Sequence, residues 1–231
     1  MTVDLSVVIP AFNEEKRLPG TLAVILPFLR ARGESFEVVV VDDGSRDGTA
    51  RVSREAGPEV RVIQNPGNRG KGYSVRNGML NAQGSWRLMS DADLSTPIEE
   101  LDGLRKAMTE GASVAIASRA VPGANLEKRQ SFMRESSGRF FNLIVRSLLL
   151  RGIKDTQCGF KLFSAAAAEA AFRGSKLDGF AFDVEALRLA HRAGFKIREV
   201  PVTWRNHEQS RVSFARGLAA FVDLFRLYFR G

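Results

Sequence analysis

Short apolar runs rich in β-branched residues alternate with helix-compatible stretches along the first half of this chain, and this alternation constrains its fold most. The runs are typical of buried parallel strands and cover residues 5–9, 36–41, 60–63, 86–89 and 114–117. The stretches between them predict helices over residues 19–32, 49–56, 71–82 and 97–110. The last of these helices starts at Thr96-Pro97-Ile98-Glu99, the pattern of a capping box. Strands alternating with helices predict an α/β fold with a mostly parallel sheet and helices on both faces.

The regular alternation of predicted strands and helices ends after about residue 119. A loop is expected first. The sequence then predicts helices over residues 135–150, 165–172, 183–193 and 216–229, and a strand over residues 197–203. No internal repeat or low-complexity linker interrupts the sequence. We therefore predict one domain over residues 1–215, with halves at residues 1–119 and 120–215, followed by an amphipathic helix over residues 216–231.

Polar clusters follow three of the predicted strands. They are Pro10-Ala11-Phe12-Asn13-Glu14-Glu15, Asp42-Asp43-Gly44-Ser45 and Asp91-Ala92-Asp93. In an open parallel sheet, ligands bind beyond the carboxyl ends of the strands, so these clusters are expected at one functional edge. Each cluster taken alone is also compatible with ordinary turn chemistry, because Asp and Asn favour turns.

The pair Asp91 and Asp93 predicts a site for a hard divalent cation. Such cations take oxygen ligands and are commonly completed by substrate phosphates rather than by a full protein cage. The alternative is that Asp-x-Asp only begins a turn. The single cysteine, Cys158, excludes an intramolecular disulfide, and two histidines are too few for a His-based metal site.

Two common nucleotide-binding motifs are missing from the sequence. A Gly-x-Gly-x-x-Gly segment does not follow the first strand, and a Gly-Lys-Ser/Thr phosphate loop is also absent, which argues against a dehydrogenase or a P-loop enzyme. The segment Gly67-Asn68-Arg69-Gly70-Lys71-Gly72 is glycine-rich and basic at the start of a helix. It fits contact with a nucleotide phosphate or base, or else a flexible turn.

Taken together, the motifs resemble glycosyltransferase family 2. The resemblance rests on residues 6–15, on Val41-Asp42-Asp43-Gly44-Ser45-x-Asp47-Gly48-Thr49, on Asn68-x-Gly70-Lys71-Gly72 and on Asp91-Ala92-Asp93. The second half resembles the dolichyl-phosphate β-glucosyltransferase branch and its bacterial polyprenyl-phosphate relatives. It does so through residues 155–163, Phe182-Asp183-Val184-Glu185 and Val200-Pro201-Val202-Thr203-Trp204. The resemblance implies the Rossmann-like GT-A fold, with residues 1–119 binding the nucleotide sugar and residues 120–215 the acceptor.

The family resemblance also implies roles for individual residues. Contact with uridine or ribose is expected from Pro10, Ala11, Glu14 and Asp42, supported by Asp43. Lys71 is expected near the nucleotide. The resemblance places Mg²⁺ or Mn²⁺ on Asp91 and Asp93, where the ion would hold the diphosphate. Arg119 is expected either to add positive charge near the leaving group or to form a structural salt bridge.

The implied reaction is an inverting, metal-dependent transfer of a hexose, expected to be glucose, from UDP to a dolichyl or undecaprenyl phosphate. The product would be a β-linked lipid phosphate sugar. A lipid monophosphate is largely ionised at neutral pH, so it needs no general base. Alternatives are a family 2 transferase that uses GDP-mannose, another donor or a soluble acceptor, and a non-catalytic membrane or nucleic-acid binding module. The acidic strand edge argues against nucleic acid, because it repels a phosphate backbone.

The basic charge of the chain is concentrated in its second half. The net charge is +8, of which residues 119–154 contribute +6 and residues 196–231 contribute +4. An anionic partner is therefore expected there. Arg134, Arg139, Arg205 and Arg211 are candidates for binding the acceptor phosphate through bidentate hydrogen bonds.

Two amphipathic helices of the second half are candidates for an anionic membrane surface. The predicted helices at residues 135–150 and 216–229 combine a narrow polar stripe that carries arginines with a wide apolar arc, which favours binding in the bilayer interface. Packing on the core or a homo-oligomer interface is the alternative. The amino terminus lacks a signal-peptide pattern, and no apolar run is long enough to span a bilayer. We therefore expect a peripheral protein at the cytoplasmic face of a membrane.

Overall fold

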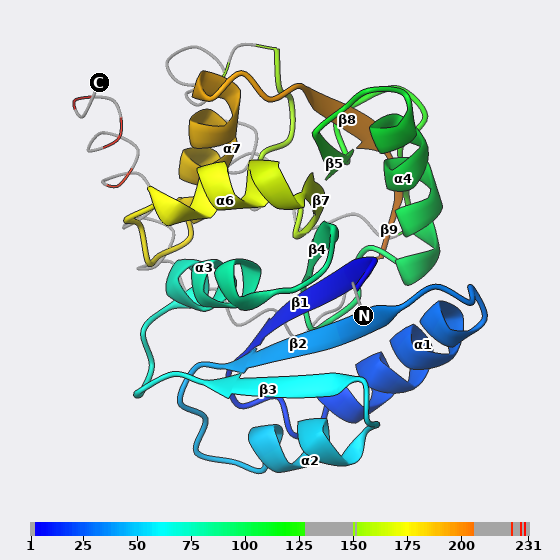
Figure 1. Ribbon diagram of the computed structural model, residues 1–231, viewed down its shortest axis with the longest axis vertical. Helices are drawn as coiled ribbons and strands as arrows, with labels where there is room; N and C mark the ends of the chain where they lie inside the picture. Colours follow the sequence, from blue (N-terminus) through cyan, green and yellow to red (C-terminus); the bar gives the residue numbers. More distant parts are fainter. Residues whose placement is uncertain are drawn as a thin grey trace.

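The computed structural model describes residues 3–127, 150, 152–205, 223, 227 and 229. Within these residues, seven strands form one sheet in the order β3-β2-β1-β4-β7-β5-β8 (Figure 1). The strands are β1 (Leu5–Ala11), β2 (Phe36–Asp42), β3 (Val60–Gln64), β4 (Trp86–Ser90), β5 (Val114–Ser118), β7 (Phe160–Ser164) and β8 (Ile197–Pro201). The predicted strands are confirmed, and each lies within two residues of its expected bounds.

Strand β7 was not predicted from the sequence. It lies between β4 and β5 and is antiparallel to both, whereas the pairs β1–β2, β1–β4, β2–β3 and β5–β8 are parallel. The strand is buried on both faces, yet it includes Lys161, which breaks the apolar run that a buried strand usually shows. The sheet therefore takes strands from both predicted halves of the chain.

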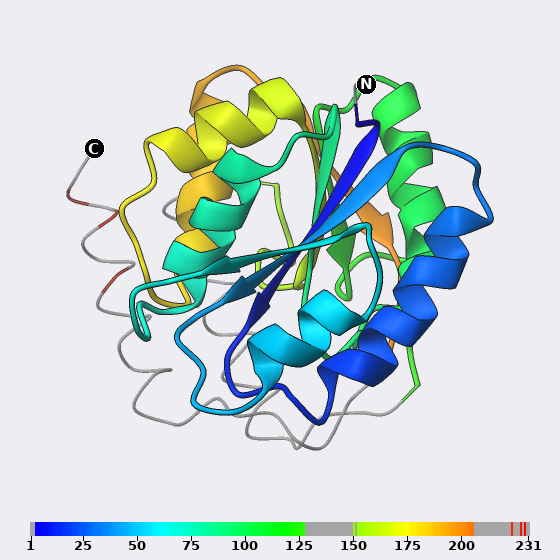
Figure 2. The same ribbon diagram turned by 60° about the horizontal axis from the view of Figure 1, so that its bottom comes forward.

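Helices cover both faces of the sheet, as predicted. Figure 2 shows α3 and α6 on one side of the strands and α1 and α4 on the other. The helices are α1 (Leu18–Arg30), α2 (Thr49–Glu55), α3 (Lys71–Asn81), α4 (Leu101–Thr109), α6 (Ala165–Arg173) and α7 (Phe182–Arg192). Each helix matches a stretch that the sequence predicted, with ends shifted by a few residues.

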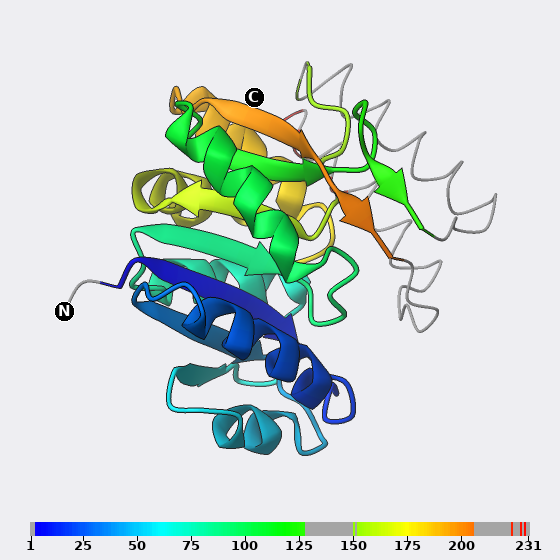
Figure 3. The same cartoon turned by 90° about the vertical axis from the view of Figure 1, so that its right-hand side faces the viewer.

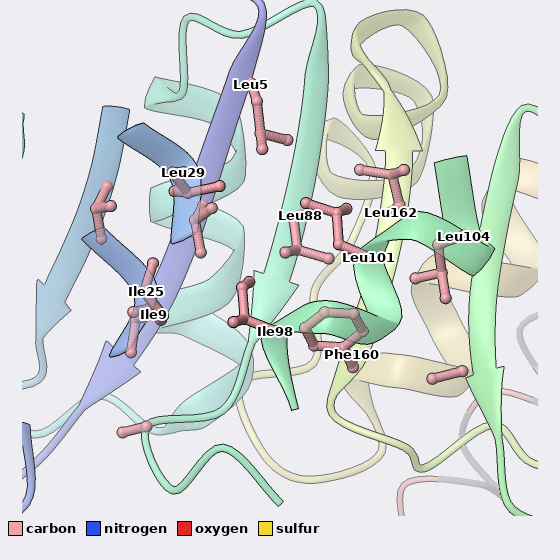
Figure 4. Packing of buried hydrophobic residues seen from close by; sticks show 14 of the residues in the cluster. Leu5, Ile9, Ile25, Leu29, Leu88, Ile98, Leu101, Leu104, Phe160 and Leu162 are labelled. Atoms are coloured by element: carbon pink, nitrogen blue, oxygen red, sulfur yellow. The ribbon is translucent and has the colours of Figure 1, made fainter. Parts of the chain in front are cut away.

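The two faces of the sheet carry separate hydrophobic cores. On one face, Val8, Met89 and Phe163 pack under α3, α6 and α7. On the other, Ile9 and Leu88 pack against α1 and α4, as the labelled side chains in Figure 4 show. Fully burying one such side chain contributes about 2 kcal/mol, so both cores fix the strand ends firmly.

The capping box expected at the start of α4 does not form. The chain enters that helix through a short 3₁₀ turn, η1 (Ile98–Glu100), which has no side-chain cap. Thr96, the expected cap, is instead buried, and its hydroxyl lies 3.5 Å from the Cys158 sulfur. Packing against Cys158 therefore replaces the capping interaction.

A second, two-stranded sheet extends beyond β8. Strand β6 (Asn125–Leu126) pairs in parallel with β9 (Thr203–Trp204), which follows β8 along the chain (Figure 3). In the described ranges, no helix combines the length and the apolar character needed to cross a bilayer.

The predicted amphipathic helices lie largely outside the described residues. Residues 135–149 are not described, and three positions of the final helix are. Leu227, within the predicted final helix, is only 5% exposed and packs in the hydrophobic cluster that includes residues of α7. Phe229 is 81% exposed. At Leu227 the structure shows packing on the core, which was the stated alternative, and the membrane role of the helix stays a prediction.

Candidate functional site

The three predicted polar clusters lie at the same edge of the sheet. Ala11 and Asp42, the last residues of β1 and β2, are paired in register, and Val8 of β1 is paired with Met89 of β4. Asp91 directly follows the last residue of β4. The carboxyl ends of parallel strands thus bring these clusters to one edge, which is where ligands bind in open α/β sheets.

The loops after β1 and β2 are joined by hydrogen bonds. The Asn13 amide donates to the Ser45 hydroxyl at 2.9 Å, and the Arg46 amide donates to the Asn13 side-chain oxygen at 2.9 Å. The Glu14 amide donates to the Thr49 hydroxyl at 2.8 Å, and the Glu14 carboxylate accepts from Arg17 at 3.2 Å. Asn13 has a φ of 56°, which Asn tolerates better than most residues. Turn chemistry therefore accounts for much of these two clusters.

Asp42 and Asp43 have different surroundings, although both are buried. Asp42 accepts a hydrogen bond from the Ser45 amide at 3.0 Å, and the Gln64 side chain donates to it at 3.3 Å. Asp43 accepts from the backbone amides of Arg69 and Gly70, each at 2.9 Å. Asp43 therefore holds the glycine-rich segment that leads into α3.

Lys71, the first residue of α3, forms an ion pair with Asp91. The ammonium nitrogen lies 2.6 Å from Oδ1 of Asp91. Burial opposes the charge on Lys71, but the carboxylates of Asp91 and Asp183 outweigh this effect and raise the pKa of the lysine. The sequence predicted both residues at the site, but not that they would touch.

The register of β7 places Gly159 beside Asp91. Ser90 of β4 is paired with Phe160 of β7, and the Asp91 amide donates to the Gly159 carbonyl at 3.1 Å. A side chain on residue 159 would overlap the Asp91 carboxylate. Asp93 accepts a hydrogen bond from the Ser95 amide at 2.9 Å, which fixes the turn after Asp91.

A buried ion pair joins Lys161 of β7 to Asp183 at the start of α7. Both side chains are almost fully buried, and Lys161 also donates to the Cys158 carbonyl. Burial raises the pKa of the Asp183 carboxyl, although Lys161 and Lys71 oppose this shift. Sequence reasoning used both segments only as marks of the family and assigned these residues no role.

Arg119, which follows β5, forms a bidentate ion pair with Asp155. Its Nε and one terminal nitrogen lie 2.7 Å and 2.9 Å from the two carboxylate oxygens. Burial opposes the charge on Arg119, but Asp155 outweighs it and raises the pKa of the guanidinium. The guanidinium also lies over the Trp204 ring, 5.5 Å from its centre. The structural salt bridge expected as one alternative is therefore present.

Of the four arginines proposed to bind an acceptor phosphate, Arg205 is described. It follows β9, and its Nε lies 2.9 Å from Glu127 in an exposed ion pair. Arg134, Arg139 and Arg211 lie outside the described residues, so their predicted roles stay predictions.

The donor set at Asp91 and Asp93 fits a hard divalent cation. The Asp91 side chain is 32% exposed at the open edge of the sheet, and its oxygens are the ligands that Mg²⁺ and Mn²⁺ prefer. Among the described residues, no group of three or more His, Cys, Asp or Glu side chains is placed to hold a metal. With only the described residues considered, a cation at this pair would therefore take its remaining ligands from substrate phosphates or water.

The mostly parallel sheet with two carboxylates directly after a central strand is the arrangement expected from the resemblance to GT-A sugar transferases. The family model described as "Glycosyl transferase family 2" matches residues 6–172. The chain therefore belongs to glycosyl transferase family 2. The predicted family, enzyme class and fold are confirmed.

Several curated relatives are similar over almost the whole chain. A dolichyl-phosphate beta-glucosyltransferase of Drosophila melanogaster is 38% identical, and the match covers 99% of this chain and 76% of the relative. The enzyme of the same name from Dictyostelium discoideum is 34% identical, covering 98% of this chain and 74% of the relative. The human enzyme of that name is 37% identical, covering 91% and 70%. Their activity agrees with the one that the sequence predicted.

Solved structures share the fold. Mannosyl-3-phosphoglycerate synthase from Rubrobacter xylanophilus superimposes with a TM-score of 0.76 at 19% identity, covering 99% of this chain and 76% of the other. Glucosyl-3-phosphoglycerate synthase from Mycobacterium tuberculosis, in complex with Mn²⁺ and UDP-glucose, has a TM-score of 0.76 at 20% identity. This match covers 98% of this chain and 79% of the other. At these identities the likeness establishes the GT-A fold.

Proposed function

We propose that this chain transfers glucose from UDP-glucose to a polyprenyl phosphate, of the dolichyl or undecaprenyl type, with inversion at the anomeric carbon. The observation that carries this proposal is the Lys71–Asp91 pair, which stands with Asp93 at the carboxyl edge of the sheet. The activity of the curated relatives supports the donor and the acceptor class.

The nucleotide half of the donor would lie over the ends of β1 and β2. Pro10 and Ala11 end β1 beside Asp42, and Glu14 stands in the joined loops. Asp42 is buried and its two carboxylate oxygens accept from the Ser45 amide and the Gln64 side chain, so a ribose hydroxyl would use a remaining lone pair. Asp43 would act indirectly, because its hydrogen bonds hold the segment that carries Lys71.

Asp91 and Asp93 would hold Mg²⁺ or Mn²⁺. When bound, the ion neutralises charge that develops on the departing diphosphate. Lys71 adds a positive charge at the same place, and Arg119 stands close enough to Asp91 for their charges to interact. Because Arg119 is already paired with Asp155, its contribution to the leaving group is smaller than that of an unpaired arginine.

The acceptor would bring its own nucleophile. A lipid monophosphate is largely ionised at neutral pH, so its oxygen attacks without a protein base. Attack from the face opposite the leaving diphosphate turns an α-linked donor into a β-linked product. Arg134, Arg139, Arg205 and Arg211 are the proposed contacts of the acceptor phosphate, and the basic second half is the proposed contact with an anionic membrane surface on its cytoplasmic side.

A transfer assay with a radiolabelled donor tests this proposal. UDP-glucose, UDP-galactose, UDP-N-acetylglucosamine and GDP-mannose are each offered with a polyprenyl phosphate in vesicles, with Mg²⁺, with Mn²⁺ or with EDTA. Labelled lipid from UDP-glucose alone, lost in EDTA, is the expected result. Labelling from another donor would overturn the choice of sugar, and hydrolysis without lipid labelling would overturn the acceptor.

The Asp91→Asn variant tests the metal ligand in the same assay. We expect a loss of turnover of at least about 100-fold, because removing one preorganised charge at the reacting centre has effects of this size. Asp102→Asn is the control, since its carboxylate is exposed on α4 and lies outside the site. Full activity of Asp91→Asn would contradict the assignment.

A further inference from the structure

The Lys71 ammonium contacts one of the two carboxylate oxygens that Asp91 could offer to a divalent cation. Its nitrogen lies 2.6 Å from Oδ1 of Asp91, and the two side chains are 24% and 32% exposed. The pair is thus open to solvent on one side. A cation that binds Asp91 through Oδ1 competes with Lys71 for that oxygen, because the two positive charges repel each other at this distance.

The rear of the Asp91 carboxylate is closed. Gly159 lies so near that a Cβ would overlap the carboxylate, and the Asp91 amide is bonded to the Gly159 carbonyl. Asp91 therefore cannot turn back to offer a second site behind Lys71. Lys71 and a metal ion would therefore both approach the Asp91 carboxylate from its solvent-exposed side.

The charges around Lys71 favour this competition. Lys71 interacts with Asp91, Asp93 and Asp183, and Asp183 is also paired with Lys161. With these described groups ionised, the cluster carries one net negative charge. A divalent cation alone reverses that sign and repels Lys71. The dianionic diphosphate of a nucleotide sugar makes the net charge of the cluster negative again. It also gives the displaced Lys71 ammonium a new anionic partner.

We propose that Lys71 couples metal binding to donor binding at this site. In the donor-free protein Lys71 neutralises Asp91 and weakens the site for a metal alone. When the diphosphate arrives, Lys71 moves from Asp91 to the phosphate oxygens and leaves Asp91 to the metal. The inference rests on the proposed function, because it takes Asp91 and Asp93 as the metal ligands.

Binding of Mn²⁺, measured from the electron paramagnetic resonance signal of the free ion, tests the coupling without turnover. The wild-type chain is expected to bind Mn²⁺ weakly alone and at least about tenfold more tightly with saturating UDP, within the usual range of coupling between sites. By reciprocity, Mn²⁺ should tighten UDP binding by the same factor.

Substitution of the lysine identifies its part in the coupling. Lys71→Met is expected to bind Mn²⁺ alone more tightly than wild type, and its coupling factor should fall towards one. Lys71→Arg keeps the charge and should retain most of the coupling. Lys106→Met is the matched control on the exposed face of α4. Unchanged Mn²⁺ affinity and coupling in Lys71→Met would overturn the proposal.

Failure of the proposed function gives a different pattern. If Asp91→Asn binds Mn²⁺ as the wild type does, with and without UDP, then Asp91 is not a ligand and the metal assignment itself is wrong. If Asp91→Asn loses Mn²⁺ while Lys71→Met keeps the wild-type coupling, the metal site stands and the role of Lys71 is refuted.

Discussion

Gly159 lies directly behind the carboxylate of Asp91, although the two residues belong to different halves of the chain. The antiparallel register of β4 and β7 creates this contact. The Asp91 amide also donates a hydrogen bond of 3.1 Å to the Gly159 carbonyl. A side chain at residue 159 would overlap the carboxylate. The position of the proposed metal ligand thus depends on a strand that the sequence did not reveal.

The Gly159→Ala variant should displace Asp91 and lower kcat/KM by about 100-fold, because an error of about 1 Å at a reacting centre has that effect. Steady-state kinetics with UDP-glucose measures the loss, and thermal unfolding shows whether the fold survives. Gly20→Ala is the control, since a Cβ there meets no atom within 4 Å. Unchanged kinetics of Gly159→Ala would show that Asp91 tolerates the shift.

The Lys161→Met variant should destabilise the fold by about 3 to 5 kcal/mol. Its partner Asp183 would be left buried without its ion-pair partner, and breaking a buried pair at one end has a cost of this size. Urea unfolding measures the change. Replacing both residues, as Lys161→Met with Asp183→Leu, should recover much of the loss, because no isolated charge remains. A single variant as stable as the wild type would contradict this account.

The sequence predicted most of the sheet but could not reveal β7. Runs such as residues 36–41 are apolar throughout, and a strand buried on both faces needs such a run. Strand β7 departs from this rule at Lys161, which is buried because Asp183, 22 residues further along the chain, neutralises it. Sequence periodicity reports local burial and does not report a partner that only folding brings near.

The same limit applies to the candidate site. The Asp-x-Asp motif predicted Asp91 and Asp93 as metal ligands at the sheet edge, and the family resemblance implied Lys71 near the nucleotide. The ion pair between Lys71 and Asp91 depends on the distance between two separate elements, which no motif contains. The capping box at Thr96 failed for a related reason, since contact with Cys158 was not visible in the local pattern.

The Asp155→Asn variant should lower the free energy of unfolding at neutral pH by about 2 kcal/mol, a typical value for hydrogen bonds to a charged group. Burial raises the pKa of Asp155, but the Arg119 guanidinium outweighs this and holds the pKa below its ordinary value. The stabilisation is therefore complete above the unfolded-state pKa, about 4, and is lost as the pH falls through the lower folded-state value.

Urea unfolding at a series of pH values checks the sign of this effect. The difference in stability between wild type and Asp155→Asn should be constant near neutral pH and should shrink below pH about 4. A difference that grows on acidification would contradict the assignment of Asp155 as an ionised partner of Arg119.

The Asp43→Ala variant should weaken UDP binding by about tenfold, although Asp43 lies behind the proposed donor site. Its carboxylate accepts from the amides of Arg69 and Gly70, and the loss of these hydrogen bonds releases the segment that sets the position of Lys71. A net contribution of about 1 kcal/mol from each of the two bonds sets an upper limit of about 30-fold, and a tenfold change corresponds to about 1.4 kcal/mol. Isothermal titration with UDP and Mn²⁺ measures it. Asp43→Asn keeps one acceptor oxygen and should lie between Ala and wild type, whereas equal UDP affinity in all three chains would show that the segment holds its shape without Asp43.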